Sequence, residues 1–227
     1  MAKRKTSAND ETLVDIVEVR ESAESFVENN QKLIFGALVA LVLVVGGYFA
    51  YKYLFQIPKQ KEAVEQMYKA QEQFERDSFR LALTNPGSGF PGFLDIIDQY
   101  SGTPAANSAN YYAGISYLHL GEYDAAIAYL KDFDADDEVL PITKFGAIGD
   151  AYAEKGDLGQ AMSFYKKAVS AGDNEILTAY YLKKVGMLNE KNGDLGAAKQ
   201  AYEQIQKDYP NSNEGRDIEK YIARVSK

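Results

Sequence analysis

The chain has 227 residues, of which 46% are hydrophobic, and it carries 25 Lys and Arg against 33 Asp and Glu, a formal net charge of −8 at pH 7. This acidic balance argues against binding to nucleic acid or to an anionic lipid surface. The absence of cysteine excludes disulfides, thiolate nucleophiles and zinc–thiolate sites, and the single histidine, His119, cannot build a multi-histidine metal site.

Residues 1–32 form a polar tail that begins with the basic stretch Lys3, Arg4 and Lys5. Within it, residues 11–31 place apolar side chains at helical spacing and acidic side chains on the other face. A helix that lies on a membrane surface would carry Lys and Arg there instead. We therefore expect a solvated helix or, as the second alternative, a helix that docks onto a partner.

Residues 33–51, LIFGALVALVLVVGGYFAY, contain no charge and are long enough as a helix to cross the ~30 Å hydrocarbon core of a bilayer. A buried core helix would have a polar face, and a signal peptide would carry a small residue where Tyr48 stands. Aromatic side chains crowd the far edge of the run, as they do at membrane interfaces. We expect a transmembrane helix over residues 33–54, with Gly36 and Ala40 forming a small-residue face for an intramembrane contact.

After this run, Pro58 is expected to break the chain. Residues 59–83 are predicted to form one long helix, residues 84–92 a Pro- and Gly-rich loop, and residues 93–100 a short helix. One face of the long helix carries Ala63, Met67, Ala70 and Phe74.

Three segments then repeat: residues 111–130, 145–165 and 183–202. The first glycines of the segments are Gly114, Gly149 and Gly186, the second are Gly121, Gly156 and Gly193, and the shared alanines are Ala126, Ala161 and Ala198. The first glycines are spaced by 35 and 37 residues, which is the length of two helices and a turn. Each second glycine is predicted to end a helix in the left-handed conformation. The acid that follows it (Glu122, Asp157, Asp194) is predicted to begin the next helix, where negative charge is favoured.

Each first glycine lies inside a predicted helix, at a cost of about 1 kcal/mol relative to alanine. Three such costs at one equivalent position predict a close approach by the second helix of the unit. We expect Gly149 to face Ala161 across this contact, and Tyr117 and Tyr152 to fill the space beside it. Apolar residues at helical spacing near the C-terminus, Ile218, Tyr221, Ile222 and Val225, predict a helix that caps the stack.

These small and aromatic positions resemble the tetratricopeptide repeat over residues 107–210, with residues 59–104 as an atypical first unit. The resemblance implies an all-α, tetratricopeptide-like solenoid of helical hairpins over residues 59–227, beside one N-terminal transmembrane helix. It also implies a protein-binding groove lined by the first helix of each unit. The groove residues that it implies are Tyr111, Tyr112, Ile115, Asp150, Tyr180, Lys183, Lys184 and Met187. His119, Gly146 and Glu154 would also face outward. Packing of some tyrosines between repeats is the alternative.

The wider layout, a short acidic tail with Phe26 and Asn30 before the span, one anchor and a compact repeat domain, resembles the YfgM-type family of ancillary SecYEG translocon subunits. That resemblance implies the bacterial inner membrane, a cytoplasmic N-terminus and a periplasmic repeat domain. The partners that it implies are translocon channel subunits, a periplasmic chaperone or an emerging polypeptide.

A cytosol-facing receptor for precursor or chaperone proteins is the alternative. Basic residues favour it, because Lys52, Lys59, Lys61 and Lys69 follow the span, whereas Arg20 and Lys32 precede it.

No arrangement of residues points to catalysis, so neither an enzyme nor a cofactor nor a metal is expected. There is no phosphate-binding loop after a strand and no paired histidine motif. Residues 132–140 carry enough carboxylates for calcium but lack the turn glycine and terminal glutamate of a calcium loop, and we expect a solvated loop there.

Overall fold

The computed structural model describes Arg20 and residues 23–226. Its contacts divide the chain into two compact units, Met1–Pro58 and Lys59–Lys227. The predicted tail helix at residues 11–31 falls largely outside the described residues, and its described end, residues 23–29, is helical.

The first unit contains α2 (Gln31–Tyr51) and a π-helical turn, η1 (Lys52–Gln56). Its apolar run is the one helical stretch in the described part of the chain that is long and apolar enough to cross a membrane. No residue of α2 is buried, and a Cβ added at Gly36 would meet nothing within 4 Å. An apolar surface of this extent is unfavourable in water and is consistent with a single-pass anchor.

The boundary between the two units falls at the expected place, directly after Pro58, but the helix is not broken there, because α3 (Ile57–Glu75) begins before the proline. Proline lacks an N–H and its ring clashes with the carbonyl four residues earlier in a regular α-helix. Here the preceding turn is widened to π-helix, in which the Ile57 N–H donates to the Lys52 carbonyl. The wider turn lets the backbone remain helical through the proline.

The predicted helix over residues 59–83 is instead two helices, α3 and α4 (Phe79–Thr84). Between them Asp77 takes a positive φ of 55°, and the Ser78 N–H donates to the Gln73 carbonyl at 2.9 Å. The reversal brings the edge of the Phe74 ring onto Phe79, with ring centroids 5.5 Å apart. Packing between aromatic side chains on both sides of the turn therefore overrides the helical spacing of the sequence.

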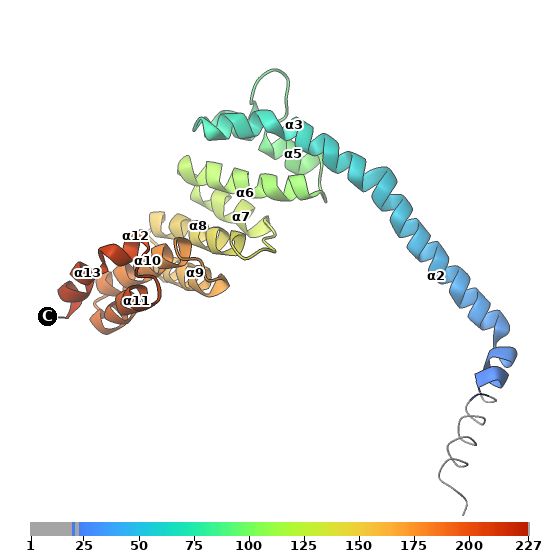
Figure 1. The fold of residues 1–227 in the computed structure, drawn as a ribbon. Coiled ribbons are helices and arrows are strands. Elements are labelled where there is room, and N and C mark those ends of the chain that lie inside the picture. Colours follow the sequence, from blue (N-terminus) through green and yellow to red (C-terminus); the bar gives the residue numbers. More distant parts are fainter. Residues whose placement is uncertain (1–19, 21–22, 227) are drawn as a thin grey trace, which may run out of the picture. The chain divides into compact units, whose positions relative to one another are not determined.

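The second unit continues as helices throughout its described residues, which confirms the predicted all-α fold. The helices are α5 (Phe93–Gln99), α6 (Pro104–His119), α7 (Tyr123–Asp132), α8 (Leu140–Glu154), α9 (Leu158–Ala171), α10 (Leu177–Lys191), α11 (Leu195–Asp208), α12 (Asn213–Arg216) and α13 (Ile218–Val225). Figure 1 shows α6 to α11 as successive neighbouring pairs, and each predicted repeat is one such pair.

The turns within the pairs form as the sequence predicts. Gly121, Gly156 and Gly193 have φ values of 76°, 80° and 81°, so each helix ends in the left-handed conformation. The carboxylates of Asp157 and Asp194 accept from backbone N–H groups three residues later, at 3.0 and 2.9 Å, and cap α9 and α11.

The first glycine of each repeat receives a large side chain from the second helix. A Cβ at Gly114 would lie 2.6 Å from Leu130 Cγ, one at Gly149 would lie 2.6 Å from the Tyr165 ring, and one at Gly186 would lie 2.3 Å from Tyr202 Cε1. The expectation that Gly149 faces Ala161 is therefore wrong in its partner. The close approach is confirmed, but the residue that makes it lies one helical turn after the alanine.

Aromatic stacking joins the two helices of a repeat at a second place. Tyr117 stacks on Tyr129, and Tyr152 stacks on Phe164, each with ring centroids 5.4 Å apart. Beyond the last repeat, α13 packs against α11 and buries Ile218 and Val225, as expected for a capping helix.

Alanine at Gly186 is expected to lower the free energy of unfolding by about 1–3 kcal/mol, because its Cβ would overlap the buried Tyr202 ring. Gly196→Ala is the matched control, because its nearest neighbour, Asp194 Oδ1, is 3.7 Å from the Cβ position. This control is expected to be neutral or to stabilise by up to about 1 kcal/mol. Urea unfolding followed by circular dichroism measures both, and equal midpoints would contradict the close contact.

Candidate functional site

The first helices of the three repeats, α6, α8 and α10, lie next to one another in that order. Side chains from α6, α8 and α10, together with Tyr123 at the start of α7 and Tyr165 of α9, surround a pocket of about 380 Å³, which we call the Asp150 pocket. Its lining residues are Leu118, His119, Tyr123, Asp150, Ala153, Glu154, Tyr165 and Lys184.

Asp150 of α8 is the centre of a hydrogen-bonded group that we call the Asp150 cluster: Asp150, Tyr165 and Lys184. The Tyr165 hydroxyl donates to Asp150 Oδ1 at 2.7 Å, and the Lys184 ammonium donates to the same oxygen. The Lys184 Nζ also lies 4.6 Å from the centroid of Tyr180 and 5.3 Å from that of Tyr165. Three helices, α8, α9 and α10, thus meet through one carboxylate.

Electrostatics in this cluster hold the lysine charged and the tyrosines neutral. Burial, then the hydrogen bond to Asp150, raises the pKa of Tyr165 above its usual value. Burial, then the charge of Asp150, also raises the pKa of Tyr181. For Lys184, burial acts to lower the pKa, but the bonds to Asp150 and Tyr180 outweigh it and the pKa is raised. Lys184 therefore stays protonated at neutral pH.

The structure brings together three of the eight groove residues expected from the sequence. Tyr111 instead packs beside Phe133, with ring centroids 5.2 Å apart, and meets Tyr112 edge to face. Asp150, Tyr180 and Lys184 meet as described. Tyr180 is 40% exposed and so presents its ring to solvent.

Tyr112 and Lys183 lie elsewhere. The Tyr112 ring stacks on Phe93 and meets the edge of Phe74, with ring centroids 5.0 Å away in both cases. It therefore packs in the hydrophobic core that α3, α4, α5 and α6 share. Lys183 points toward the capping helix, where its Nζ lies 5.1 Å from the Tyr221 ring centroid. For Tyr112 the structure thus favours the alternative that a tyrosine packs between repeats.

Ile115 is half-buried and packs against the hydrophobic cluster that contains Ala126 and Ile148, whereas Met187 is 48% exposed on α10.

The expectation that Gly146 faces outward is wrong, because Gly146 is buried and a Cβ there would overlap the Tyr181 ring, 1.8 Å from Cζ. The absence of a side chain at this position allows Tyr181 to insert between α8 and α10.

Sequence reasoning missed Tyr165, Tyr181 and Tyr123, and it missed the pairing of Asp150 with Lys184. One signal could have found Tyr165, and another could have found the ion pair. Tyr165 lies four residues after the repeated Ala161, on the same helical face. Asp150 and Lys184 are 34 residues apart, one repeat length, so a carboxylate and a lysine occupy neighbouring positions on consecutive first helices.

The same arrangement recurs one repeat later in the Glu190 cluster: Glu190, Tyr202 and Arg224. The Tyr202 hydroxyl donates to Glu190 at 3.1 Å, and the Arg224 guanidinium of α13 binds both carboxylate oxygens, at 2.6 and 2.7 Å. The spacing from Glu190 to Arg224 is again 34 residues. Burial, then the bond to Glu190, raises the pKa of Tyr202 to about 12.

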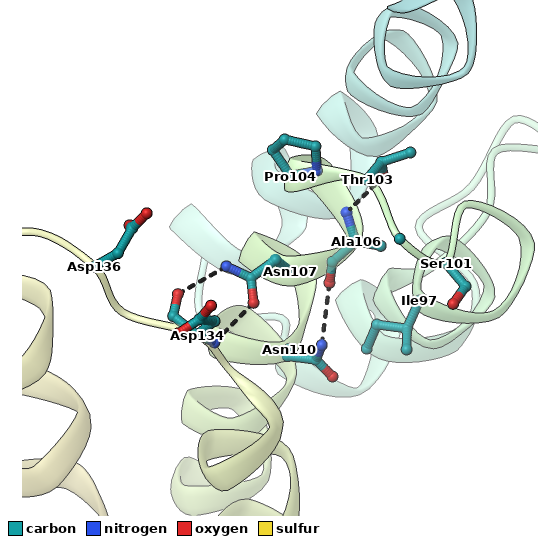
Figure 2. A pocket seen from close by; sticks show the side chains of 10 residues that line it. Ile97, Ser101, Thr103, Pro104, Ala106, Asn107, Asn110, Asp134 and Asp136 are labelled. Atoms are coloured by element: carbon teal, nitrogen blue, oxygen red, sulfur yellow. Dashed lines mark hydrogen bonds between the residues drawn. The ribbon is translucent and has the colours of Figure 1, made fainter. Parts of the chain in front are cut away.

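A larger pocket of about 500 Å³ lies at the start of α6, beside the loop after α7. Figure 2 shows its polar groups bonded to one another: the Asn107 side chain pairs with both backbone groups of Asp134, at 2.8 Å each, and the Ala106 N–H donates to Thr103. Asp136 lies apart from them on the loop. Because these groups satisfy one another, the pocket offers few free donors or acceptors to a ligand.

Among residues 23–226 and Arg20, no group of three or more His, Asp or Glu is placed to hold a metal ion. One acid of the 132–140 loop has a structural role instead. The Asp137 carboxylate accepts from the N–H groups of Val139 and Leu140, at 2.8 and 2.6 Å, and so caps the start of α8.

Comparison with protein families agrees with this architecture. Three tetratricopeptide repeat models match, over residues 93–138, 145–171 and 184–212. No curated protein matches the chain. The hairpins in the matched residues are therefore tetratricopeptide repeats, which imply a protein–protein interaction scaffold, and no enzyme family is among the matches.

Replacement of Lys184 by Met is expected to lower the free energy of unfolding by about 1–2 kcal/mol, because it leaves the half-buried Asp150 without its cation. The loss is smaller than for a fully buried pair because the two side chains are 25% and 27% exposed. Lys183→Met, one residue away and over the Tyr221 ring, is the matched control and is expected to stay within about 0.5 kcal/mol of the parent. Equal effects in denaturant titrations would contradict the assignment of Lys184 to Asp150.

Proposed function

We propose that this tetratricopeptide-repeat chain is a membrane-anchored protein that binds polypeptides at the Asp150 pocket and works as an ancillary subunit at the Sec translocon. Its partners are secreted chains or a periplasmic chaperone, together with channel subunits in the membrane. The chain is divided for this purpose into a polar tail (1–32), a transmembrane helix (33–54) and a repeat domain with a capping helix (59–227).

The observation that carries the proposal is the surface around Asp150. Tyrosines supply much contact area at low entropic cost, and Tyr180 and Tyr123 present such rings beside charged groups. Met187, exposed on the same helix as Tyr180, adds an adaptable apolar side chain. An extended polypeptide lying across α6, α8 and α10 would contact all of these groups.

The anchor supports the membrane part of the proposal. The apolar side chains of α2 are exposed along its length, and the Gly36 and Ala40 face is open to another helix. Tethering raises the effective concentration of a partner held at the same membrane, so weak contacts at the Asp150 pocket are sufficient for capture. The choice of the translocon, the inner membrane and a periplasmic repeat domain comes from the resemblance of the layout to the YfgM-type family.

The second candidate is a cytosol-facing receptor that recognises precursor or chaperone proteins. The four lysines that follow the span, against two basic residues before it in the same distance, favour retention of the repeats in the cytoplasm. Large domains are translocated with little regard to such counts, and the first residues of the tail add three basic charges.

A reporter that is active only outside the cytoplasm, fused after Lys227, is expected to be active, and a cytoplasm-only reporter at the same position is expected to be silent. The reason is that the proposed topology places the N-terminus in the cytoplasm and the repeats across the membrane. Protection of the repeat domain from protease added to spheroplasts would favour the cytosol-facing receptor instead.

Photocrosslinking in cells tests the two contacts separately. A crosslinker at Tyr180, whose ring lies against Lys184 of the Asp150 pocket, is expected to capture secreted polypeptides or a soluble chaperone. Lys166, exposed on α9 and not part of the pocket lining, is the control. A crosslinker at Gly36 is expected to capture a channel subunit, and Leu38, about 200° around the helix, is its control.

The identities of the adducts decide between the parts of the proposal. Absence of polypeptide adducts from Tyr180 would refute binding at the Asp150 pocket. Adducts from Gly36 that contain no translocon component would refute the membrane partner while leaving an anchored polypeptide-binding protein.

A further inference from the structure

The charges around the Asp150 pocket are not balanced. Lys184 is the one Lys or Arg in its lining, and its ammonium is bound to Asp150. Glu154, the second carboxylate of the lining, forms no hydrogen bond or ion pair within the described residues and is exposed at the end of α8. The pocket therefore holds one negative charge that the chain itself does not neutralise.

Basic residues in the neighbouring segments are also engaged. Lys155, next to Glu154, pairs with Asp124 of α7, and Arg80 of α4 pairs with Glu122 at 3.3 Å. Lys155 and Arg80 are therefore each bound to another carboxylate and not to Glu154.

The helix ends add to this negative field. Glu154 is the last residue of α8, and Leu118 and His119, at the end of α6, line the same pocket. A helix carries partial negative charge at its C-terminus, so a carboxylate there is unfavourable and a cation is favoured. Two helix C-termini and the unpaired carboxylate therefore favour a cation, and they outnumber the one helix N-terminus in the lining, that of α7 at Tyr123.

The remaining lining suits a long basic side chain. The half-buried Tyr123 ring can contact the methylene groups or the cation, and His119 is held in place by stacking on Phe79, with centroids 4.4 Å apart and planes 3° from parallel. Of the two Asp150 oxygens, Oδ1 takes both internal donors, which leaves Oδ2 available to a ligand.

We propose that the Asp150 pocket is the specificity pocket for a Lys or Arg side chain of the bound polypeptide, held by the carboxylate of Glu154. This inference rests on the proposed polypeptide binding and names the chemistry of the ligand. It excludes a C-terminal carboxylate as the main ligand, because the only lining cation is already bound to Asp150. The same preference follows from the repeat domain as a whole, where residues 59–227 contain 19 Lys and Arg against 26 Asp and Glu.

The probe is a library of random decapeptides, selected on the full-length chain in lipid nanodiscs of zwitterionic lipid. Peptides that bind the parent chain are expected to be enriched in Lys or Arg at one position. Glu154→Gln is expected to remove that enrichment, whereas Glu175→Gln, exposed in the loop before α10 and outside the pocket, is expected to retain it.

A recovered peptide and its Lys→norleucine form then give the size of the effect by fluorescence anisotropy. Affinity of the parent chain is expected to fall by about 3- to 10-fold on this change, the range between an exposed and a partly desolvated ion pair. On Glu154→Gln the two peptides are expected to bind equally. Circular dichroism and melting should match the parent, because Glu154 has no internal partner within the described residues.

Two results would overturn the inference, and they differ from each other. Peptides that bind without basic enrichment, or that bind Glu154→Gln with unchanged preference, refute the basic-side-chain pocket and leave polypeptide binding in place. Recovery of no peptide by the parent chain refutes polypeptide binding itself and the inference with it.

Discussion

The structure of the repeat domain depends on one contact, the insertion of a large side chain from the second helix of each repeat over a glycine in the first. Leu130 lies over Gly114, Tyr165 over Gly149 and Tyr202 over Gly186, all closer than any Cβ would permit. Each of the three glycines lowers the stability of its helix. Because glycine has no side chain, the two helices approach closely enough to enclose the inserted residue. Burial of a side chain of this size stabilises the repeat by more than the glycine destabilises it.

The same contact builds the polar groups between repeats. Where the inserted residue is tyrosine, its ring passes over the glycine and its hydroxyl reaches a carboxylate farther along the first helix, Asp150 or Glu190. Each carboxylate then binds a cation 34 residues later, on the next first helix or on the capping helix. Leu130, the inserted residue of the first repeat, has no hydroxyl to donate to a carboxylate. Among the described residues, the first repeat therefore has no cluster of the inserted side chain, a carboxylate and a cation. The packing of a repeat and its connection to the next are thus achieved by one tyrosine.

Local conformation followed from the sequence to the extent that it depends on one residue and its neighbours along the chain. The turn glycines and the Asp157 and Asp194 caps formed as predicted because a left-handed turn and a capping carboxylate act within a few residues. The division of α3 from α4 did not follow, because contacts between Phe74 and Phe79 across the turn decide it. The Phe74–Phe79 contact forms only after the chain has turned back on itself, so the spacing of apolar residues along a helix does not predict it.

The groove shows the same limit in its side chains. Lys183 and Lys184 are adjacent, so they point about 100° apart on α10 and reach different helices. Tyr111 and Tyr112 differ in the same way, and Tyr112 is drawn into an aromatic core whose other members, Phe74 and Phe93, lie far away in sequence. The period of the repeat placed these residues on the first helices, but packing determines which of two neighbouring lysines contacts Asp150.

This distinction decides which substitutions can report on binding. Changes at Asp150, Lys184 or Tyr112 remove contacts that hold the repeats together, so a loss of binding in such variants would not separate recognition from folding. Glu154 differs, because it is exposed and has no internal partner in the described chain. In a repeat scaffold whose groove is built from its own structural contacts, the residues left unpaired by the fold are the ones through which ligand specificity can vary without loss of stability.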